Sequence, residues 1–83
     1  MKSIGEIENW LIQYLAGELK VPVADLPKDE PLTNLGLSSR QAVMLTGEIE
    51  EWLGKPVDPA IAWEHPTVSA LAKALGDAEA EAA

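Results

Sequence analysis

The fold of this chain is clearest from residues 35–45, which read Leu-Gly-Leu-Ser-Ser-Arg-Gln-Ala-Val-Met-Leu. Ser38 and Gln41 form the pattern of a capping box, in which the serine side chain accepts from the third helical N–H and the glutamine side chain reaches back to the cap. A helix should therefore begin at Ser38. We expect it to run to about Leu53, where Gly54 provides a C-terminal stop.

This predicted helix is amphipathic when its residues are placed at about 100° intervals around the axis. The face that we expect to be buried carries Ala42, Leu45, Thr46, Ile49, Trp52 and Leu53. The opposite face carries Arg40, Val43, Met44, Gly47 and Glu51. Exposed apolar residues such as Val43 and Met44 are typical of a docking patch.

A second capping box, Ser3 with Glu6, predicts another helix start. The helix should cover residues 4–19, because apolar residues recur there at spacings of three and four: Ile4, Ile7, Leu11, Leu15 and Leu19. Three prolines and Gly36 keep residues 20–38 from continuing as a regular helix. A loop of this length is either functional or held by its own side chains. The apolar candidates are Val21, Val23, Leu26, Leu32, Leu35 and Leu37.

Two more helices are predicted toward the C-terminus. Asp58 followed by Pro59 is typical of the start of a short helix, which should reach Trp63. Pro66 precedes a last helix that we expect to end at Gly76, with a buried stripe of Val68, Leu71, Ala72 and Leu75. The predicted fold is thus all-α: a small four-helix bundle of three main helices and a short third one, with a long loop between the first two.

The 83 residues suffice for one small domain. Residues 1–76 should form it, and residues 77–83, with three acids and no base, should be a disordered tail or a linker. The chain has no cysteine, so its stability must come from packing rather than from disulfides. We expect the isolated domain to be a monomer.

The net charge of the chain limits the classes of partner that we expect it to bind. Six basic and 14 acidic residues give a formal net charge of −8. Such a surface repels nucleic acid and anionic membranes, so we expect neither as a partner, and it favours basic proteins. The sequence shows no apolar run long enough to span a membrane and no secretory signal, and we expect a cytoplasmic location.

Several kinds of chemistry lack their usual residues. One histidine and no cysteine cannot supply a Cys-His zinc site, and no glycine-rich phosphate loop is present, so we expect no metal and no nucleotide site. Residues 36–40 come nearest to a hydrolase elbow, but Arg40 replaces its second glycine and no strand precedes it. His65 is expected to be structural or merely exposed, and the three tryptophans to belong to the core: Trp10, Trp52 and Trp63. We therefore predict no catalytic residue.

Three stretches resemble the acyl carrier protein family. Residues 35–45 resemble its signature, Leu-Gly-Leu-Asp-Ser-Leu followed by Ala-Val-Glu-Leu. Residues 48–54, Glu-Ile-Glu-Glu-Trp-Leu-Gly, are similar to its Leu-Glu-x-x-Leu-Gly, and residues 63–68, Trp-Glu-His-Pro-Thr-Val, to its Phe-Glu-x-Pro-Thr-Ile. The resemblance covers residues 4–76 and is strongest to carrier domains of modular type I polyketide synthases.

The resemblance implies a function for Ser39. In the family, the serine at this position is esterified by 4′-phosphopantetheine from coenzyme A, which a phosphopantetheinyl transferase attaches. The thiol of this arm carries acyl or polyketide intermediates as thioesters and presents them to ketosynthase, acyltransferase and other synthase domains. The residue type and position fit independently, because a helix N-terminus stabilises a phosphodiester anion.

The chain departs from the family pattern around this serine. Ser38 replaces the usual aspartate. The serine keeps the capping role, but it lacks the charge that in the family helps the transferase bind magnesium. Arg40 replaces a leucine and Met44 a common glutamate, so the acidic recognition face is weakened. We expect partner proteins to contact Arg40, Val43, Met44, Gly47, Glu48 and Glu51.

Other functions stay open from the sequence. A peptidyl or aminoacyl carrier domain would share the serine and the fold. An unmodified helical docking module would share only the fold. A hydrolase is the weakest alternative.

Overall fold

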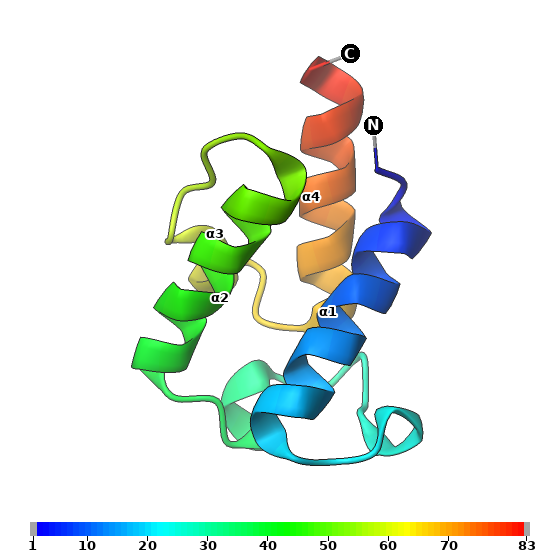
Figure 1. Cartoon of the computed structure of the whole chain (residues 1–83), viewed down its shortest axis with the longest axis vertical. Helices are drawn as coiled ribbons and strands as arrows, with labels where there is room; N and C mark the ends of the chain where they lie inside the picture. Colours follow the sequence, from blue (N-terminus) through cyan, green and yellow to red (C-terminus); the bar gives the residue numbers. More distant parts are fainter. Residues whose placement is uncertain (1, 83) are drawn as a thin grey trace.

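The computed structural model describes residues 2–82, with side chains through residue 80, and this part of the chain contains four α-helices and two 3-10 turns. The helices are α1 (Ile4–Leu19), α2 (Ser39–Leu53), α3 (Ile61–Glu64) and α4 (Val68–Ala82). In Figure 1, α1 runs antiparallel to both α2 and α4, and α3 lies behind α2. The described part of the chain contains no strand, so the all-α prediction is confirmed.

The starts of the two long N-terminal helices agree with the prediction because both capping boxes form. The Ser3 hydroxyl accepts from the Glu6 N–H at 3.1 Å, and the Glu6 carboxylate accepts from the Ser3 N–H at 3.3 Å. α1 ends at Lys20, which has a left-handed φ of 57°, and α2 ends at Gly54, with a φ of 73°. The predicted ranges of both helices are confirmed.

The predicted end of the last helix is wrong. α4 passes through Gly76 with helical backbone and continues to Ala82. Gly76 is buried against Ile4 of α1, so it serves a close approach between helices rather than a stop. Glu79 lies 3.5 Å from Lys55, which ties the extension to the end of α2. Residues 77–82 are thus helical rather than disordered, while a linker role for residues 77–83 stays a prediction.

The short third helix also begins later than predicted. α3 starts at Ile61, not at Pro59. The Asp58 carboxylate accepts from the N–H of Ala60 at 2.9 Å. This bond spans two residues, as in an Asx turn, so Asp58 shapes the turn that leads into the helix instead of capping the helix itself.

Apolar side chains from all four helices and from the long loop form one core. Its fully buried large members are Ile7, Leu11, Leu15, Leu45, Ile49, Val68 and Leu71. Of the loop residues, Leu26, Leu32 and Leu37 are buried, whereas Leu35 is only partly buried and Val21 and Val23 are exposed. Three of the six apolar loop side chains that were candidates to hold the loop are therefore buried in the core.

Backbone hydrogen bonds fix the long loop to the C-terminal half of the chain. The Leu32 N–H donates to the carbonyl of Pro66 at 2.7 Å, and the Ser69 N–H donates to the carbonyl of Lys28 at 3.1 Å. The loop crosses one end of the bundle (Figure 1), and both bonds join it to the chain around the start of α4. Within residues 2–82, none of the helices has the length and apolar character that crossing a membrane requires.

Candidate functional site at the start of α2

The chain reaches α2 through a tight turn. Residues Leu32–Leu35 form a 3-10 turn that ends at Gly36, whose φ of 93° is a conformation that favours glycine. Leu37 then enters the core and its N–H donates to the carbonyl of Leu32 at 3.2 Å. Because Leu37 is anchored, the next residue, Ser38, is held at the cap of α2.

The two adjacent serines have different environments. The hydroxyl of Ser38 accepts from the Gln41 N–H at 3.1 Å, and the Gln41 side chain accepts from the Ser38 N–H at 2.9 Å. Ser39 is the first residue of α2 and is exposed. One hydroxyl is therefore committed to the helix cap, and the other lies at the surface.

The electrostatic environment of Ser39 suits an anion. N–H groups in the first turn of a helix lack intrahelical partners, and the helix dipole places partial positive charge there. The first turn of α2 contains no acidic residue, and Arg40 follows Ser39 directly. A phosphodiester on Ser39 would thus meet unpaired N–H groups and a cation rather than a carboxylate.

A small apolar cavity adjoins the cap of α2. Its volume is about 20 Å³, and its walls are Leu32, Thr33, Leu37, Ser38, Ala42, Ala62, Trp63 and Pro66. That volume holds about one water molecule and is too small for an acyl chain. In this conformation, cargo carried near Ser39 would have to lie outside the core.

The prediction that Trp63, in the wall of this cavity, is buried in the core is wrong. Its side chain is 52% exposed, whereas the prediction placed it in the core with Trp10 and Trp52. The other two tryptophans are partly buried and pack against the core. α3 is a single turn, so its residues do not follow a stripe that a hydrophobic pattern would reveal. The proximity of Trp63 to the serines depends on tertiary packing alone.

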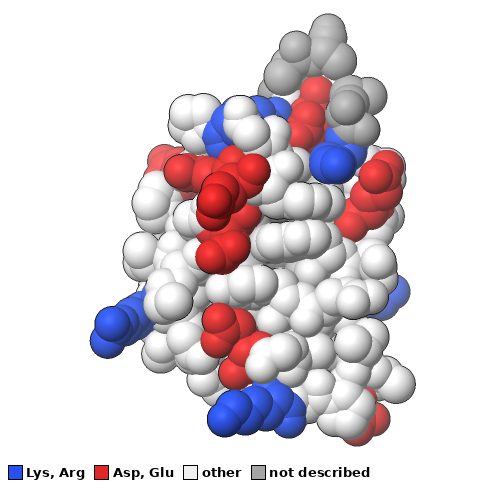
Figure 2. All heavy atoms as spheres, viewed as in Figure 1, with Lys and Arg blue, Asp and Glu red and all other residues white. Residues whose placement is uncertain are grey.

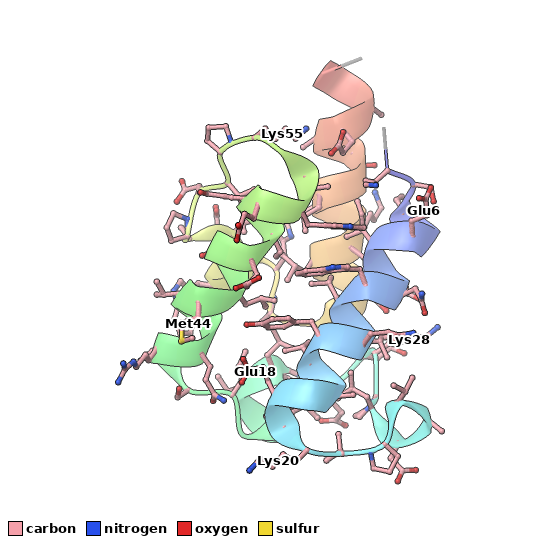
Figure 3. All side chains as sticks on the ribbon, viewed as in Figure 1. Glu6, Glu18, Lys20, Lys28, Met44 and Lys55 are labelled. Carbon is pink, nitrogen blue, oxygen red and sulfur yellow. The ribbon has the colours of Figure 1, made fainter. Side chains whose placement is uncertain are left out.

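The six residues predicted to contact partners are all exposed: Arg40, Val43, Met44, Gly47, Glu48 and Glu51. Val43 and Met44 are 53% and 52% exposed, and Figure 3 shows Met44 pointing away from the bundle. Glu48 differs from the others because its charge acts on Tyr14 of α1. The structure therefore brings most of the set onto the outer side of α2 and places Glu48 toward α1.

Tyr14 carries a perturbed hydroxyl. Burial raises its pKa from 10.0 to about 12, and Glu18 and Glu48 add to this rise. The Tyr14 hydroxyl donates to Glu18 at 3.1 Å, which stabilises the neutral phenol. At neutral pH the residue is uncharged, so it acts as an aromatic surface and not as an acid or base.

The described residues offer no alternative centre built on a metal ion or a buried polar group. No cluster of three His, Cys, Asp or Glu side chains in residues 2–80 could hold a metal ion. Every buried polar side-chain atom in this part of the chain has a hydrogen-bond partner. The candidate site is thus the exposed Ser39 at the start of α2, next to Ser38, which lines the apolar cavity.

The chain as a whole matches a known family. Residues 9–75 match the family described as "Phosphopantetheine attachment site". The chain belongs to this family. It is a carrier domain, and the family carries covalently attached 4′-phosphopantetheine and has no catalytic activity of its own.

Relatives of the carrier domain include large synthases. It is 43% identical over 74 residues to a phenolphthiocerol/phthiocerol polyketide synthase of Mycobacterium tuberculosis, a match that covers 89% of this chain and 4% of that protein. The carrier domain thus spans a small part of such a relative.

Solved structures agree with the fold of the carrier domain. An acyl carrier protein from Anabaena sp. PCC 7120, described as having a variant phosphopantetheinylation-site sequence, is 38% identical and superposes with a TM-score of 0.86 over 92% of this chain and 86% of that one. A free-standing peptidyl carrier protein from Acinetobacter baumannii is 26% identical, with a TM-score of 0.87 over 94% and 98%. The bundle is therefore shared by acyl and peptidyl carriers.

Proposed function

We propose that Ser39 is the residue that carries the 4′-phosphopantetheine arm. The observation that carries this proposal is the division between the adjacent serines: Ser38 uses its hydroxyl in the cap, while Ser39 is exposed at the first position of α2. The unpaired N–H groups of the first turn and Arg40 fit the phosphodiester of the arm. When bound, the arm supplies the thiol that holds cargo as a thioester.

We further propose that the domain carries acyl or polyketide intermediates. This rests on its similarity to a polyketide synthase and on the similar acyl carrier protein from Anabaena. The name of that protein records a variant attachment sequence, and Ser38 in place of aspartate would be a variant of the same region. The partners would be a phosphopantetheinyl transferase, a ketosynthase, an acyltransferase and other synthase domains.

The docking face for these partners is proposed to be the outer side of α2. Val43 and Met44 supply exposed apolar surface, while Arg40 and Glu51 supply charge. Apolar contact persists in salt, whereas exposed charges are screened beyond about 8 Å at physiological ionic strength. Partner binding through this face should therefore weaken only in part as salt is raised. A monomeric state and a cytoplasmic location are further predictions.

The attachment site can be tested by intact mass spectrometry. The unmodified protein is incubated with a broad-specificity phosphopantetheinyl transferase and coenzyme A. Wild type and Ser38→Ala should gain the mass of one phosphopantetheine group, and Ser39→Ala should gain none. Both variants keep Arg40 and the rest of α2, so they are matched controls for each other. Modification of Ser39→Ala, or an arm mapped to Ser38, would refute the assignment.

A peptidyl or aminoacyl carrier is the second candidate, because the fold superposes equally well on a peptidyl carrier protein. The two candidates differ in the partner that loads the arm. Acyltransferases should load the modified protein, and aminoacyl-adenylating domains should not. Efficient loading by an adenylating domain alone would support the peptidyl function instead. The absence of any mass gain would favour an unmodified docking module.

A further inference from the structure

Trp63 is a large apolar side chain that the fold leaves at the surface beside the paired serines. It is 52% exposed, and it lines the small apolar cavity that Ser38 also lines. In the described part of the chain, no other aromatic ring stacks on Trp63 and no ammonium group lies over it, in contrast to Trp52. The exposed part of this side chain is therefore free to contact another molecule.

The backbone holds Trp63 in this position. Its N–H donates to the carbonyl of Ala60 at 3.0 Å, and its neighbour Ala62 is buried in the core. Three residues after Trp63, the carbonyl of Pro66 accepts from the Leu32 N–H at 2.7 Å. Trp63 is thus anchored on both sides along the chain instead of being carried by a free loop.

Helical geometry places Ser39 close to the same cavity. Residues three positions apart are neighbours on the surface of a helix, so Ser39 lies next to Ala42. Ala42 is buried and, like Trp63 and Ser38, lines the cavity. A group attached to Ser39 therefore starts beside the cavity and the exposed tryptophan.

The charges of α2 keep an anionic group at this end of the helix. The first turn contains no acidic residue, and Figure 2 shows the acidic side chains over α2 gathered toward its C-terminal end. Unpaired N–H groups at the start of α2 stabilise a phosphodiester on Ser39. Because the phosphate is held there, the group that follows it in the arm has to lie close by.

The part of the arm nearest to the phosphate is apolar. In 4′-phosphopantetheine, a single methylene joins the phosphate oxygen to a quaternary carbon that bears two methyl groups, and a hydroxyl, two amides and the thiol follow. The later groups hydrogen-bond well to water, whereas the methyl groups gain from contact with apolar surface. An apolar surface beside Ser39 would therefore bind this first part of the arm in preference to the rest.

The cavity suits a methyl group better than a water molecule. It holds about one water molecule by size, and a methyl group is of similar size. A buried water needs about two to four polar partners, but the hydroxyls in the cavity wall are those of Thr33 and Ser38. The Ser38 hydroxyl already accepts from the Gln41 N–H.

We propose that Trp63 and the cavity beside it bind the dimethyl group of the arm, which makes Trp63 a cofactor-contacting residue. This proposal rests on the proposed attachment of the arm at Ser39. Contact with the indole ring and the cavity fixes the first part of the arm against α3. The amides and the thiol stay in solvent, where partner domains reach them.

Nuclear magnetic resonance on the full chain, before and after modification with a transferase and coenzyme A, tests the contact. Intact mass shows that modification is complete. The two methyl signals of the arm should move upfield from their positions in free coenzyme A, because an aromatic ring shields protons above its face, and nuclear Overhauser effects should connect them to the ring of Trp63. Trp10 stacks on Tyr14 and on Trp52, and Trp52 lies about 20 Å along α2 from Ser39. The indole signals of Trp10 and Trp52 should therefore stay unshifted and serve as references.

Variants at two equally exposed apolar residues locate the contact. Trp63→Ala should return both methyl signals to their coenzyme A positions, and Trp63→Phe should retain an upfield shift because it keeps an aromatic ring. Val43 is 53% exposed and is also a helical neighbour of Ser39, but it lies on the outer side of α2. Val43→Ala should leave the methyl signals unchanged. Circular dichroism checks that each variant is folded, and the phenylalanine variant keeps the test valid if the alanine variant is not.

Three results in the fully modified protein would overturn the contact. They are methyl signals at the coenzyme A positions, nuclear Overhauser effects to Val43 instead of Trp63, and an upfield shift that persists in Trp63→Ala. The first result means a free arm, and the second means an arm that lies on the outer side of α2. Each of them leaves the attachment at Ser39 untouched, whereas the absence of any mass gain would refute the attachment and the contact together.

Discussion

The substitution Gly76→Ala tests a close approach between α4 and the start of α1. Gly76 is buried in α4, and a Cβ atom added there would overlap Cγ1 of Ile4 and lie 3.2 Å from the Cα atom of Ile4. Rotation of the half-exposed Ile4 side chain would remove the overlap with Cγ1 but not the close contact with the Cα atom. The start of α1 would therefore have to shift slightly away from α4, the element on which α1 packs most extensively.

Two opposing terms set the magnitude. Alanine is favoured over glycine inside a helix by about 0.8–1 kcal/mol, whereas overpacking a well-packed core costs about 1–3 kcal/mol. The net effect of Gly76→Ala should be a loss of about 1 kcal/mol in the free energy of unfolding. For a domain of this size, such a loss lowers the Tm by about 4–8 °C.

Gly47→Ala is the matched control. Gly47 is also in the interior of a long helix, is exposed, and has no atom within 4 Å of an added Cβ. Only the higher helix propensity of alanine acts there, so this variant should gain about 0.8–1 kcal/mol in the free energy of unfolding. The same substitution is thus predicted to have opposite signs at the two glycines.

Thermal unfolding followed by circular dichroism measures both variants. A third variant, Ile4→Ala in the Gly76→Ala background, should recover part of the lost stability, because it removes the Cγ1 atom but leaves the backbone of α1 close to the added methyl group. If Gly76→Ala were as stabilising as Gly47→Ala, the close packing of α4 on α1 at this position would be wrong.

Three further predictions concern the cap, the loop and pH. Ser38→Ala should lose about 0.5–2 kcal/mol in urea unfolding, because the cap of α2 is removed, whereas Ser38→Asp should retain the stability; an unchanged midpoint for the alanine variant would contradict the cap. Leu32→Ala should cost about 2–5 kcal/mol because Leu32 is buried, while the exposed Val23→Ala should stay within about 0.5 kcal/mol of wild type; equal effects would show that the loop is not anchored as described. The pKa of Tyr14 is raised to about 12, so the folded protein binds the phenolic proton more tightly than the unfolded chain does. The resulting contribution to stability is present below about pH 10 and is lost as the pH rises toward 12. Tyrosinate absorbance should titrate near that upper value, and Tyr14→Phe should abolish this part of the alkaline stability loss; a midpoint near 10 in the folded protein would refute it.

The starts of α1 and α2 could be predicted because their signals are local. A capping box involves residues only three positions apart, and both boxes form at Ser3 and Ser38 as their spacing indicates. The buried face of α2 follows from helical periodicity for the same reason. The position of Ser39 at the start of α2 can therefore be predicted from the sequence alone.

The features that the sequence analysis missed have different causes. Gly76 resembles a helix stop, but its neighbour in space is Ile4, 72 positions earlier in the chain. Trp63 resembles a core residue, but the single turn of α3 leaves it half exposed. The pair Trp10 and Tyr14 has the spacing of helix neighbours, yet only the packing of α1 on α2 adds Trp52 to the stack.

The replacement of aspartate by Ser38 links the cap to the charge of the proposed attachment site. A carboxylate would cap α2 as well as a hydroxyl does, but it would repel a nearby phosphodiester by up to roughly 1 kcal/mol in water. A neutral cap removes this repulsion, and the adjacent Arg40 contributes a positive charge. The start of α2 is thereby the least acidic part of a helix that carries Glu48, Glu50 and Glu51 farther along. Basic partners should therefore be attracted by the later turns of α2, while the first turn suits the anionic arm that we propose for Ser39.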